Sequence, residues 1–239
     1  MRLCGIHVNC RQIDDLLAYS NECKILVTAN SEAFVRAQTE PGLKKVMDEN
    51  YVSIDGQIPL WLFNIKYPNV LIKKISGSDL IYVLAEWACQ HQKKLFLLGG
   101  KQESNRQSVA KLKELYPELN IDGFSPKHEP YPFSKECEIQ IWEKISEFRP
   151  DIIFVGFGMG KQEFWEDAHK QQCTDLGVKL MVGSGGTFEF VSGMIKRAPI
   201  LIQKSGLEGI WRLINEFKWF RVKRLLLSFK IFYYFFKIK

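Results

Sequence analysis

Apolar stretches of strand length alternate with segments of helical periodicity along most of the chain. Short apolar runs predict buried strands at Lys24–Ala29, Lys94–Leu98, Asp151–Val155 and Lys179–Val182, with a further extended piece at Val70–Ile75. Helical spacing predicts helices from Ser31 onward, from Ser78 to about Gln92, and over Glu103–Leu115, Ser134–Phe148 and Gln162–Cys173. This alternation predicts an α/β fold with a Rossmann-like, largely parallel sheet and helices on both of its faces.

The pattern changes near residue 204, where basic and aromatic residues begin to alternate. Residues 204–239 carry nine Lys or Arg and two acids, a net charge of +7, whereas the whole chain carries +6, so residues 1–203 are close to neutral at about −1. We therefore expect an α/β catalytic domain over residues 1–203 and a helical C-terminal appendage over residues 204–239. We call residues 204–239 the tail.

A tail of this composition is typical of a segment that lies on an anionic, partly apolar surface. Its longest uncharged run, between Lys230 and Lys237, has six residues, far short of the roughly 20 apolar residues that cross a bilayer. We expect it to dock on a membrane surface. Nucleic acid is the competing anion, but so apolar a tail is not expected to serve as a nucleic-acid arm. A terminal amphipathic helix that packs on the protein's own core is the other alternative.

Cysteine usage and the N-terminus both indicate a reducing, cytoplasmic environment. The six cysteines are scattered, without a CxxC pair or histidines at metal-ligand spacing, so neither disulfides nor a structural metal is expected. Residues 1–15 lack the apolar core of a signal peptide. The expected location is the cytoplasm, with the tail on the inner face of the cell membrane.

Polar residues follow two of the apolar runs, where ligands bind in open parallel sheets. Thr28 and Asn30 come at the end of the Lys24–Ala29 strand, and each is also a good helix cap. Asp55 follows another apolar run and precedes Gly56, a pair that is also a common turn. An aspartate at such a position can take a proton from a sugar hydroxyl.

Three turns are suited to anions because they offer backbone N–H groups before a helix. They contain Gly77, Ser78 and Asp79; Gly99 and Gly100; and Gly185, Gly186 and Thr187, while Lys74 stands just before the first. Each turn can also simply begin a helix. Three of them in one sheet indicate a phosphorylated ligand.

The segment from Gly156 to Glu163 resembles a dinucleotide-binding fingerprint only in part. Lys161 stands where the last glycine of GxGxxG belongs, and the preceding strand is not the first of the sheet. A dinucleotide-dependent oxidoreductase is therefore a weak alternative. No Walker A sequence and no Ser/His/Asp arrangement can be assembled from the chain.

Several sequence blocks, taken together, resemble the WecG/TagA/CpsF family of bacterial glycosyltransferases. The blocks are Thr28-Ala29-Asn30, Asp55-Gly56, Gly77-Ser78-Asp79-Leu80, Leu97-Leu98-Gly99-Gly100, Gly158-x-x-Lys161-Gln162-Glu163-x-Trp165, Gly186-Thr187-Phe188-Glu189-Phe190-x-x-Gly193-x-x-x-Arg197-Ala198-Pro199 and Gly206-Leu207-Glu208-x-x-x-Arg212-Leu213. They occur in the family's order and spacing, and they cover nearly the whole chain.

The resemblance implies an inverting enzyme that moves a sugar from a UDP-sugar to a polyprenyl-diphosphate-linked saccharide in the assembly of teichoic acid or surface polysaccharide. It implies no cofactor and no metal, and the chain has no DxD sequence. Asp55 matches the family's proposed base, Thr28 and Asn30 its neighbours, and Gln162 a glutamine that matters for activity. Arg212, Arg221 and Arg224 are the nearest matches to the arginines of the family's membrane-docking appendage.

The chain also departs from the family pattern. Lys74 stands where the family usually has Arg, and Glu189 stands where it usually has Asp, so the contacts of these two positions are less certain to transfer. The donated sugar is expected to be an N-acetylhexosamine of the manno type, with glucose as the alternative. A non-catalytic nucleotide-sugar binding module is a third function class, and an apolar tail can also support a homo-oligomer.

Overall fold

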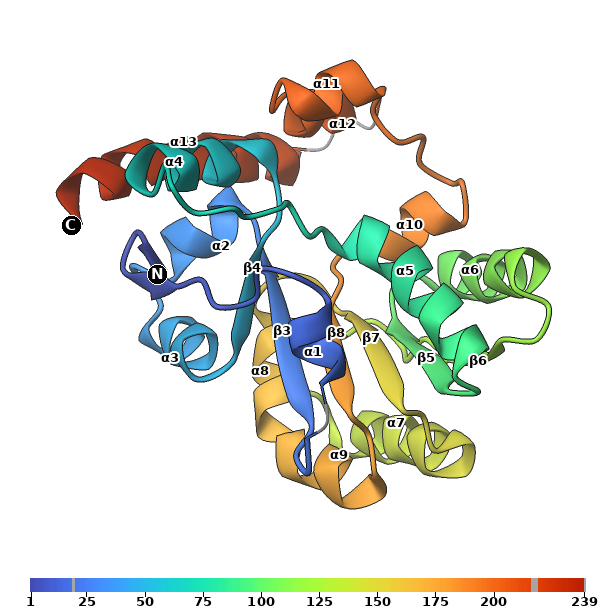
Figure 1. The fold of residues 1–239 in the computed structure, drawn as a ribbon. Helices are drawn as coiled ribbons and strands as arrows, with labels where there is room; N and C mark the ends of the chain where they lie inside the picture. The colour runs from blue at the N-terminus through green and yellow to red at the C-terminus, as the bar shows by residue number, and fades with distance from the viewer. Residues whose placement is uncertain (19, 216–218, 239) are drawn as a thin grey trace. The chain divides into compact units, whose positions relative to one another are not determined.

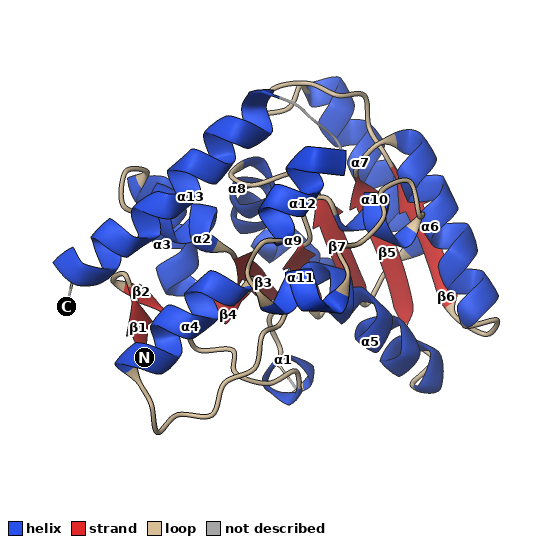
Figure 2. Cartoon of the chain, turned by 90° about the horizontal axis from the view of Figure 1, so that it is seen from above, coloured by secondary structure: helices blue, strands red, loops and turns tan. Residues whose placement is uncertain are grey.

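The computed structural model describes residues 1–18, 20–215 and 219–238. Its central feature is a six-stranded sheet with the strand order β4-β3-β8-β7-β5-β6. β5 pairs in parallel with both β6 and β7, and β7 pairs in parallel with β8. Helices flank the sheet, as Figures 1 and 2 show. The predicted α/β fold with a largely parallel sheet is confirmed.

The elements follow one another as β1 (Arg2–Leu3), β2 (Ile6–His7), α1 (Asp14–Leu17), β3 (Lys24–Ala29), α2 (Ser31–Arg36), α3 (Pro41–Glu49), β4 (Tyr51–Ile54), α4 (Gln57–Lys66), α5 (Gly77–Gln90), β5 (Lys94–Gly99), α6 (Gln102–Leu115), β6 (Asn120–Phe124), α7 (Lys135–Phe148), β7 (Ile152–Gly156), α8 (Lys161–Ala168), α9 (Lys170–Leu176), β8 (Leu180–Gly183), α10 (Thr187–Val191), α11 (Ile200–Lys204), α12 (Glu208–Asn215) and α13 (Trp219–Lys237). The chain divides into two units by its contacts. Unit 1 contains residues 1–17, 27–76 and 197–239, and unit 2 contains residues 18–26 and 77–196.

Unit 2 is built on strands β5 to β8. These strands are almost wholly buried because apolar residues occupy both of their faces, as expected for parallel strands between helices. On one side α10 contacts both α5 and α6. On the other, α7 and α8 meet through the stacked rings of Trp142 and Trp165. The large buried side chains at the centre of this unit are Phe96, Phe154, Trp165 and Phe188.

Unit 1 combines the β1–β2 hairpin, the end of β3, the whole of β4 and the tail. Helix α13 packs against α2, and Ile231 of α13 is fully buried. The Cys4 thiol lies 3.9 Å from the Ile231 carbonyl oxygen, within the wider limit for a sulfur hydrogen bond. The tail helix thus contributes to the core of unit 1. This packing matches the alternative of a terminal helix on the protein's own core, and the predicted division at residue 204 stays a prediction.

Two predicted elements differ from the observed ones, and one observed strand was not predicted. Residues 70–76 form no strand; instead they run beside β4, where the Ile75 N–H donates to the Ile54 carbonyl at 2.9 Å. The predicted helix Gln162–Cys173 is two helices, α8 and α9, which meet at His169. The β6 strand was not predicted because its sequence is polar and contains glycine. In the described part of the chain, no helix is long and apolar enough to cross a membrane.

Candidate functional site

In unit 1, the polar residues predicted from the strand ends are held by backbone hydrogen bonds. The Asp55 N–H donates to the Ala29 carbonyl at 2.9 Å, which links the chain just after β4 to the end of β3. Thr28 is nearly buried, whereas Asp55 and Asn30 are half-buried. The structure therefore brings the half-buried Asp55 beside the end of β3.

Asn30 acts as the N-cap of α2. Its Oδ1 accepts a hydrogen bond from the Ala33 N–H at 3.1 Å, so the capping role considered from the sequence is confirmed. The cap satisfies one of the four N–H groups that a helix start leaves without a partner. It also fixes the direction of the Asn30 side chain directly after β3.

Lys74 lies in the irregular segment that follows α4, directly before Ile75, whose backbone is hydrogen-bonded to β4. Ile75 is held to β4 from both of its backbone groups, because the Ser53 hydroxyl donates to the Ile75 carbonyl at 3.1 Å. Ser53 is fully buried. Lys74 is half-buried, and it is the one cation of the predicted site outside the tail.

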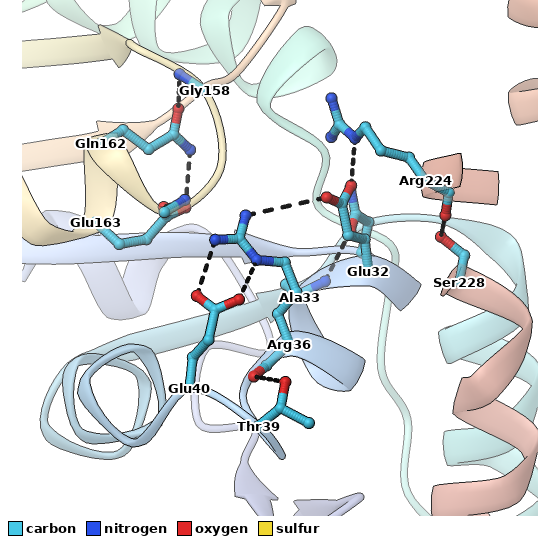
Figure 3. Close-up of polar contacts among 12 residues, drawn as sticks. Glu32, Ala33, Arg36, Thr39, Glu40, Gly158, Gln162, Glu163, Arg224 and Ser228 are labelled. Carbon is cyan, nitrogen blue, oxygen red and sulfur yellow. Dashed lines mark hydrogen bonds and ion pairs between the residues drawn. The ribbon is translucent and has the colours of Figure 1, made fainter. Parts of the chain in front are cut away.

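In unit 2, Gln162 connects the loop after β7 with the predicted turn after β8, as Figure 3 shows in part. Its Oε1 accepts from the Gly158 N–H at 3.2 Å and from the Gly185 N–H at 3.0 Å. Its Nε2 donates to Oε1 of Glu163 at 2.9 Å, and Oε2 of Glu163 accepts from the Gly160 N–H at 2.6 Å. Both side chains are buried. One amide and one carboxylate thus hold the loops after β7 and β8 in fixed positions.

The first helical residue of α5 approaches the loop after β8 closely. A Cβ atom on Gly77 would lie 3.1 Å from the Thr187 hydroxyl oxygen and 3.3 Å from Cα of Ser184. The Thr187 hydroxyl in turn donates to the Ser184 carbonyl at 2.7 Å. Gly77 is therefore needed for its small size, and the predicted turns containing Gly77 and Thr187 lie together.

The loop after β5 is closed by contacts of its own. The Gly100 N–H donates to the Gly156 carbonyl at 2.9 Å, and a Cβ on Gly99 would lie 2.7 Å from the Phe157 ring. The N–H groups of Gly100, Gly158 and Gly185 thus already have acceptors within the protein.

A buried carboxyl group lies beneath these loops and was not predicted from the sequence. Glu166 is fully buried on α8, and neither of its carboxyl oxygens has a hydrogen-bond partner. Burial, and secondly the charge of Glu163, raise the pKa of Glu166 well above 4.5. A Cβ on Gly183 of β8 would lie 3.5 Å from Oε2 of Glu166. Glu166 therefore keeps its proton to a higher pH in the folded protein than an ordinary glutamate does.

Glu166 should make the folded protein less stable as the pH rises. Above pH 4.5 the unfolded chain has released this proton while the folded chain retains it, so the free energy of unfolding falls with increasing pH until the raised pKa is reached. Glu166→Gln removes this titration. We expect the variant to gain in stability relative to the wild type between acidic and neutral pH, as measured by urea unfolding at a series of pH values.

Glu143→Gln, at an exposed position of α7, is the matched control and should follow the wild-type pH dependence. Parallel curves for the wild type and Glu166→Gln would contradict the prediction.

The tail reaches the first turn of α2 through an ion pair. Nε of Arg224 lies 2.6 Å from Oε2 of Glu32, whose side chain is only 8% exposed (Figure 3). Nη1 of Arg36 lies 4.0 Å from Oε1 of Glu32, and Arg36 also donates two hydrogen bonds to the Glu40 carboxylate. Glu32 is thus positioned between two arginines, and its pair with Arg224, whose side chain is 47% exposed, links α13 to α2.

The other two tail arginines are placed differently. Arg221 is half-buried in α13, two residues after the start of that helix. Arg212 belongs to α12, but its side chain lies outside the described residues. Among the residues that the structure describes, no three His, Cys, Asp or Glu side chains are grouped as metal ligands.

Glu32 and Glu166 were both missed by sequence reasoning. The signal for Glu166 was present, since Glu163, Trp165 and Glu166 occupy the spacing of one buried helix face, where an acid is rare. No comparable signal existed for Glu32, because its partner Arg224 lies 192 residues away.

Known proteins match the chain over most of its length. A sequence profile described as the glycosyl transferase WecG/TagA/CpsF family matches residues 1–239. An N-acetylglucosaminyldiphosphoundecaprenol N-acetyl-beta-D-mannosaminyltransferase of Staphylococcus aureus (strain MRSA252) is 32% identical over 211 residues, which are 87% of this chain and 78% of the relative. The enzyme of the same name from strain MW2 is 31% identical over the same shares. The chain belongs to the WecG/TagA/CpsF family and is a glycosyltransferase.

Proposed function

We propose that this glycosyltransferase moves N-acetylmannosamine from a UDP-sugar to a polyprenyl-diphosphate-linked N-acetylglucosamine at the cytoplasmic face of the cell membrane. The observation that carries the proposal is the similarity to two enzymes whose names specify this sugar and this acceptor, combined with an aspartate at the end of β4 in the matching sequence block. The product serves the assembly of a cell-surface polymer such as teichoic acid.

Asp55 is the general base in this proposal. The acceptor hydroxyl oxygen attacks the anomeric carbon, the bond from that carbon to the UDP oxygen breaks, and Asp55 takes the hydroxyl proton. Attack occurs from the face opposite UDP, so the configuration inverts. Thr28 and Asn30, the N-cap of α2, lie at the end of the adjacent strand β3 and orient the sugar.

The negative charge on the departing UDP is balanced by protein groups. The N-terminus of α5 presents backbone N–H groups and the positive end of a helix of 14 residues. Lys74 supplies a cation that keeps the charge, though not the two-pronged geometry, of an arginine. Within unit 2, Gln162 holds the loops after β7 and β8 to one another through its hydrogen bonds to the Gly158 and Gly185 N–H groups. No metal ion is required in this scheme, which agrees with the lack of a DxD sequence.

The tail brings the enzyme to its lipid-linked acceptor. Its exposed aromatic residues and basic excess support docking on an anionic membrane, while α13 is anchored by Ile231 and Arg224. Arg221 and Arg212 are proposed to contact lipid or substrate phosphates, for which the guanidinium group is well suited.

Acceptor-dependent release of UDP tests the substrate assignment. The full-length enzyme is mixed with a short-chain polyprenyl-diphosphate-N-acetylglucosamine and with UDP-N-acetylmannosamine, UDP-N-acetylmannosaminuronic acid, UDP-N-acetylglucosamine or UDP-glucose. We expect turnover with UDP-N-acetylmannosamine, retained in the presence of EDTA, and a β-linked product from the α-configured donor by NMR.

Turnover with UDP-glucose instead would reassign the donor. Loss of turnover in EDTA that is restored by a divalent cation would contradict the metal-independent scheme, and an α-linked product would contradict inversion. If no donor releases UDP with this acceptor, the substrate proposal is wrong.

A further inference from the structure

Helix α4 and the segment after it expose an apolar surface that the catalytic proposal does not use. Trp61 and Ile65, four residues apart and thus on one helix face, are 45% and 69% exposed, and Leu71 is 87% exposed. We call these three residues the α4 surface. The opposite face of α4 holds the helix in place through Pro59, Leu62 and Phe63, which are buried.

The charged residues close to the α4 surface in the sequence are all basic. Between Asp55 and Asp79 there are three lysines, Lys66, Lys73 and Lys74, and no acidic residue. Lys73 is exposed, and the other two are half-buried. An exposed tryptophan and two exposed aliphatic residues with lysines around them suit the interface of an anionic lipid bilayer.

The α4 surface is continuous with exposed apolar residues of the tail and of α11. A Cβ on Gly206, in the turn between α11 and α12, would lie 3.3 Å from Cγ1 of Ile58 and 3.5 Å from Cζ3 of Trp61. This turn therefore packs on α4. Figure 1 shows α4, α11, α12 and α13 together along the upper side of the view. The exposed apolar residues on the C-terminal part of this region include Ile200, Leu201, Leu207, Ile214 and Trp219.

From these contacts we propose that the α4 surface is a second membrane-contact element, which inserts Trp61, Ile65 and Leu71 into the headgroup region of an anionic bilayer together with the tail. Exposed patches of this kind mark sites of protein or membrane association. The absence of acids from the sequence between Asp55 and Asp79 favours an anionic membrane over a second copy of the chain, whose own α4 surface carries the same positive charges. The inference extends the proposed function, but binding to lipid is measured without any catalytic step.

Vesicle binding tests this inference in the full-length protein. Trp61→Ser, Ile65→Ser and Leu71→Ser are combined in one variant, whose fold is checked by circular dichroism. Its binding to phosphatidylglycerol/phosphatidylcholine vesicles is measured by sedimentation. We expect the partition coefficient to fall about tenfold, since less apolar area is buried at the interface.

A matched control replaces three exposed apolar residues of unit 2, Val83, Leu115 and Ile139, with Ser and should bind as the wild type does. Undiminished binding by the α4 variant, or an equal loss in the control, would overturn the inference. So would a wild-type dimer in vesicle-free buffer that the α4 variant converts to a monomer, because a second copy would then cover this surface.

A fluorescent label provides an independent measurement that does not require the three substitutions to be combined. Leu71→Cys is made with Cys89→Ser, since the five other native cysteines are buried. An NBD label at position 71 should shift to shorter emission wavelength on anionic vesicles and be quenched by brominated lipid, whereas the same label at Leu115→Cys should not. No shift at position 71 would overturn the inference even if the transferase assay succeeds. Conversely, a shift without any UDP release would leave the inference standing and count against the proposed reaction alone.

Discussion

Replacing Asp55 with Asn is expected to lower kcat by at least about a thousandfold, within the range by which a positioned general base contributes to catalysis. Asn keeps the size and half-buried setting of Asp55 but does not take up a proton at neutral pH. The hydrogen bond from the residue 55 N–H to the Ala29 carbonyl involves the backbone alone, so the end of β4 should keep its place. The measurement is acceptor-dependent UDP release under single-turnover conditions, with UDP affinity determined in parallel.

The chain offers a matched control for this substitution. Asp122 also precedes a glycine, Gly123, but it is exposed on β6. Asp122→Asn should therefore keep wild-type kcat. Wild-type turnover in Asp55→Asn would assign the base elsewhere, and Glu163 and Glu189 would then be replaced by Gln in turn. Of these, Glu163 is fully buried and already accepts from the Gly160 N–H, whereas Glu189 is half-buried.

Gln162→Ala is expected to reduce kcat/KM by about a hundredfold, because a shift of about 1 Å in a catalytic loop can have an effect of this size. The substitution removes the acceptor of two N–H groups, at Gly158 and Gly185, and the donor to Glu163. Leaving such groups without partners should also lower the free energy of unfolding by about 1–3 kcal/mol. Steady-state kinetics and urea unfolding measure the two effects separately.

Two further variants locate the cause of the Gln162 effect. Gln171→Ala removes an exposed glutamine that donates to Asp175 on α9 and should change neither quantity. Gln162→Glu keeps the oxygen that accepts from both loops but replaces the donor to Glu163 with a second carboxylate. If the loop contacts matter most, Gln162→Glu should retain more activity than Gln162→Ala at low pH, where the added carboxyl is protonated. Unaltered kcat/KM in Gln162→Ala would show that the bridge between the loops is not needed for the reaction.

Most sheet strands could be predicted because parallel strands between two layers of helices are apolar on both faces. Lys24–Ala29 was predicted at its observed bounds, and Asp151–Val155 and Lys179–Val182 at bounds within one residue of them. Edge strand β6 was missed because only part of it is buried. The break at His169 was missed because periodicity continues across it; there Nδ1 of the ring lies 2.8 Å from the Trp165 carbonyl oxygen.

The candidate site could be predicted in part. Positions after strands and before helices identify Asp55, Asn30 and the glycine turns, because their place in an α/β fold follows from the order of elements. The hydrogen-bond partners of the turns could not be predicted from the sequence. The Gly100 N–H appeared from the sequence to be an anion donor, yet it donates to Gly156, which comes near only through the pairing of β5 with β7.

By itself, the sequence determined the α/β class, the family blocks and the contrast between a near-neutral body and a basic, aromatic tail, because each of these depends on residue type and local spacing. Only the tertiary structure decided which tail residues turn inward, how Gln162 joins two loops, and that Glu166 is a buried acid with a raised pKa. The physical reason is the same in each case. Burial, pKa and ion pairing depend on groups that are distant in sequence, as Arg224 is from Glu32, and the chain must fold before these groups meet.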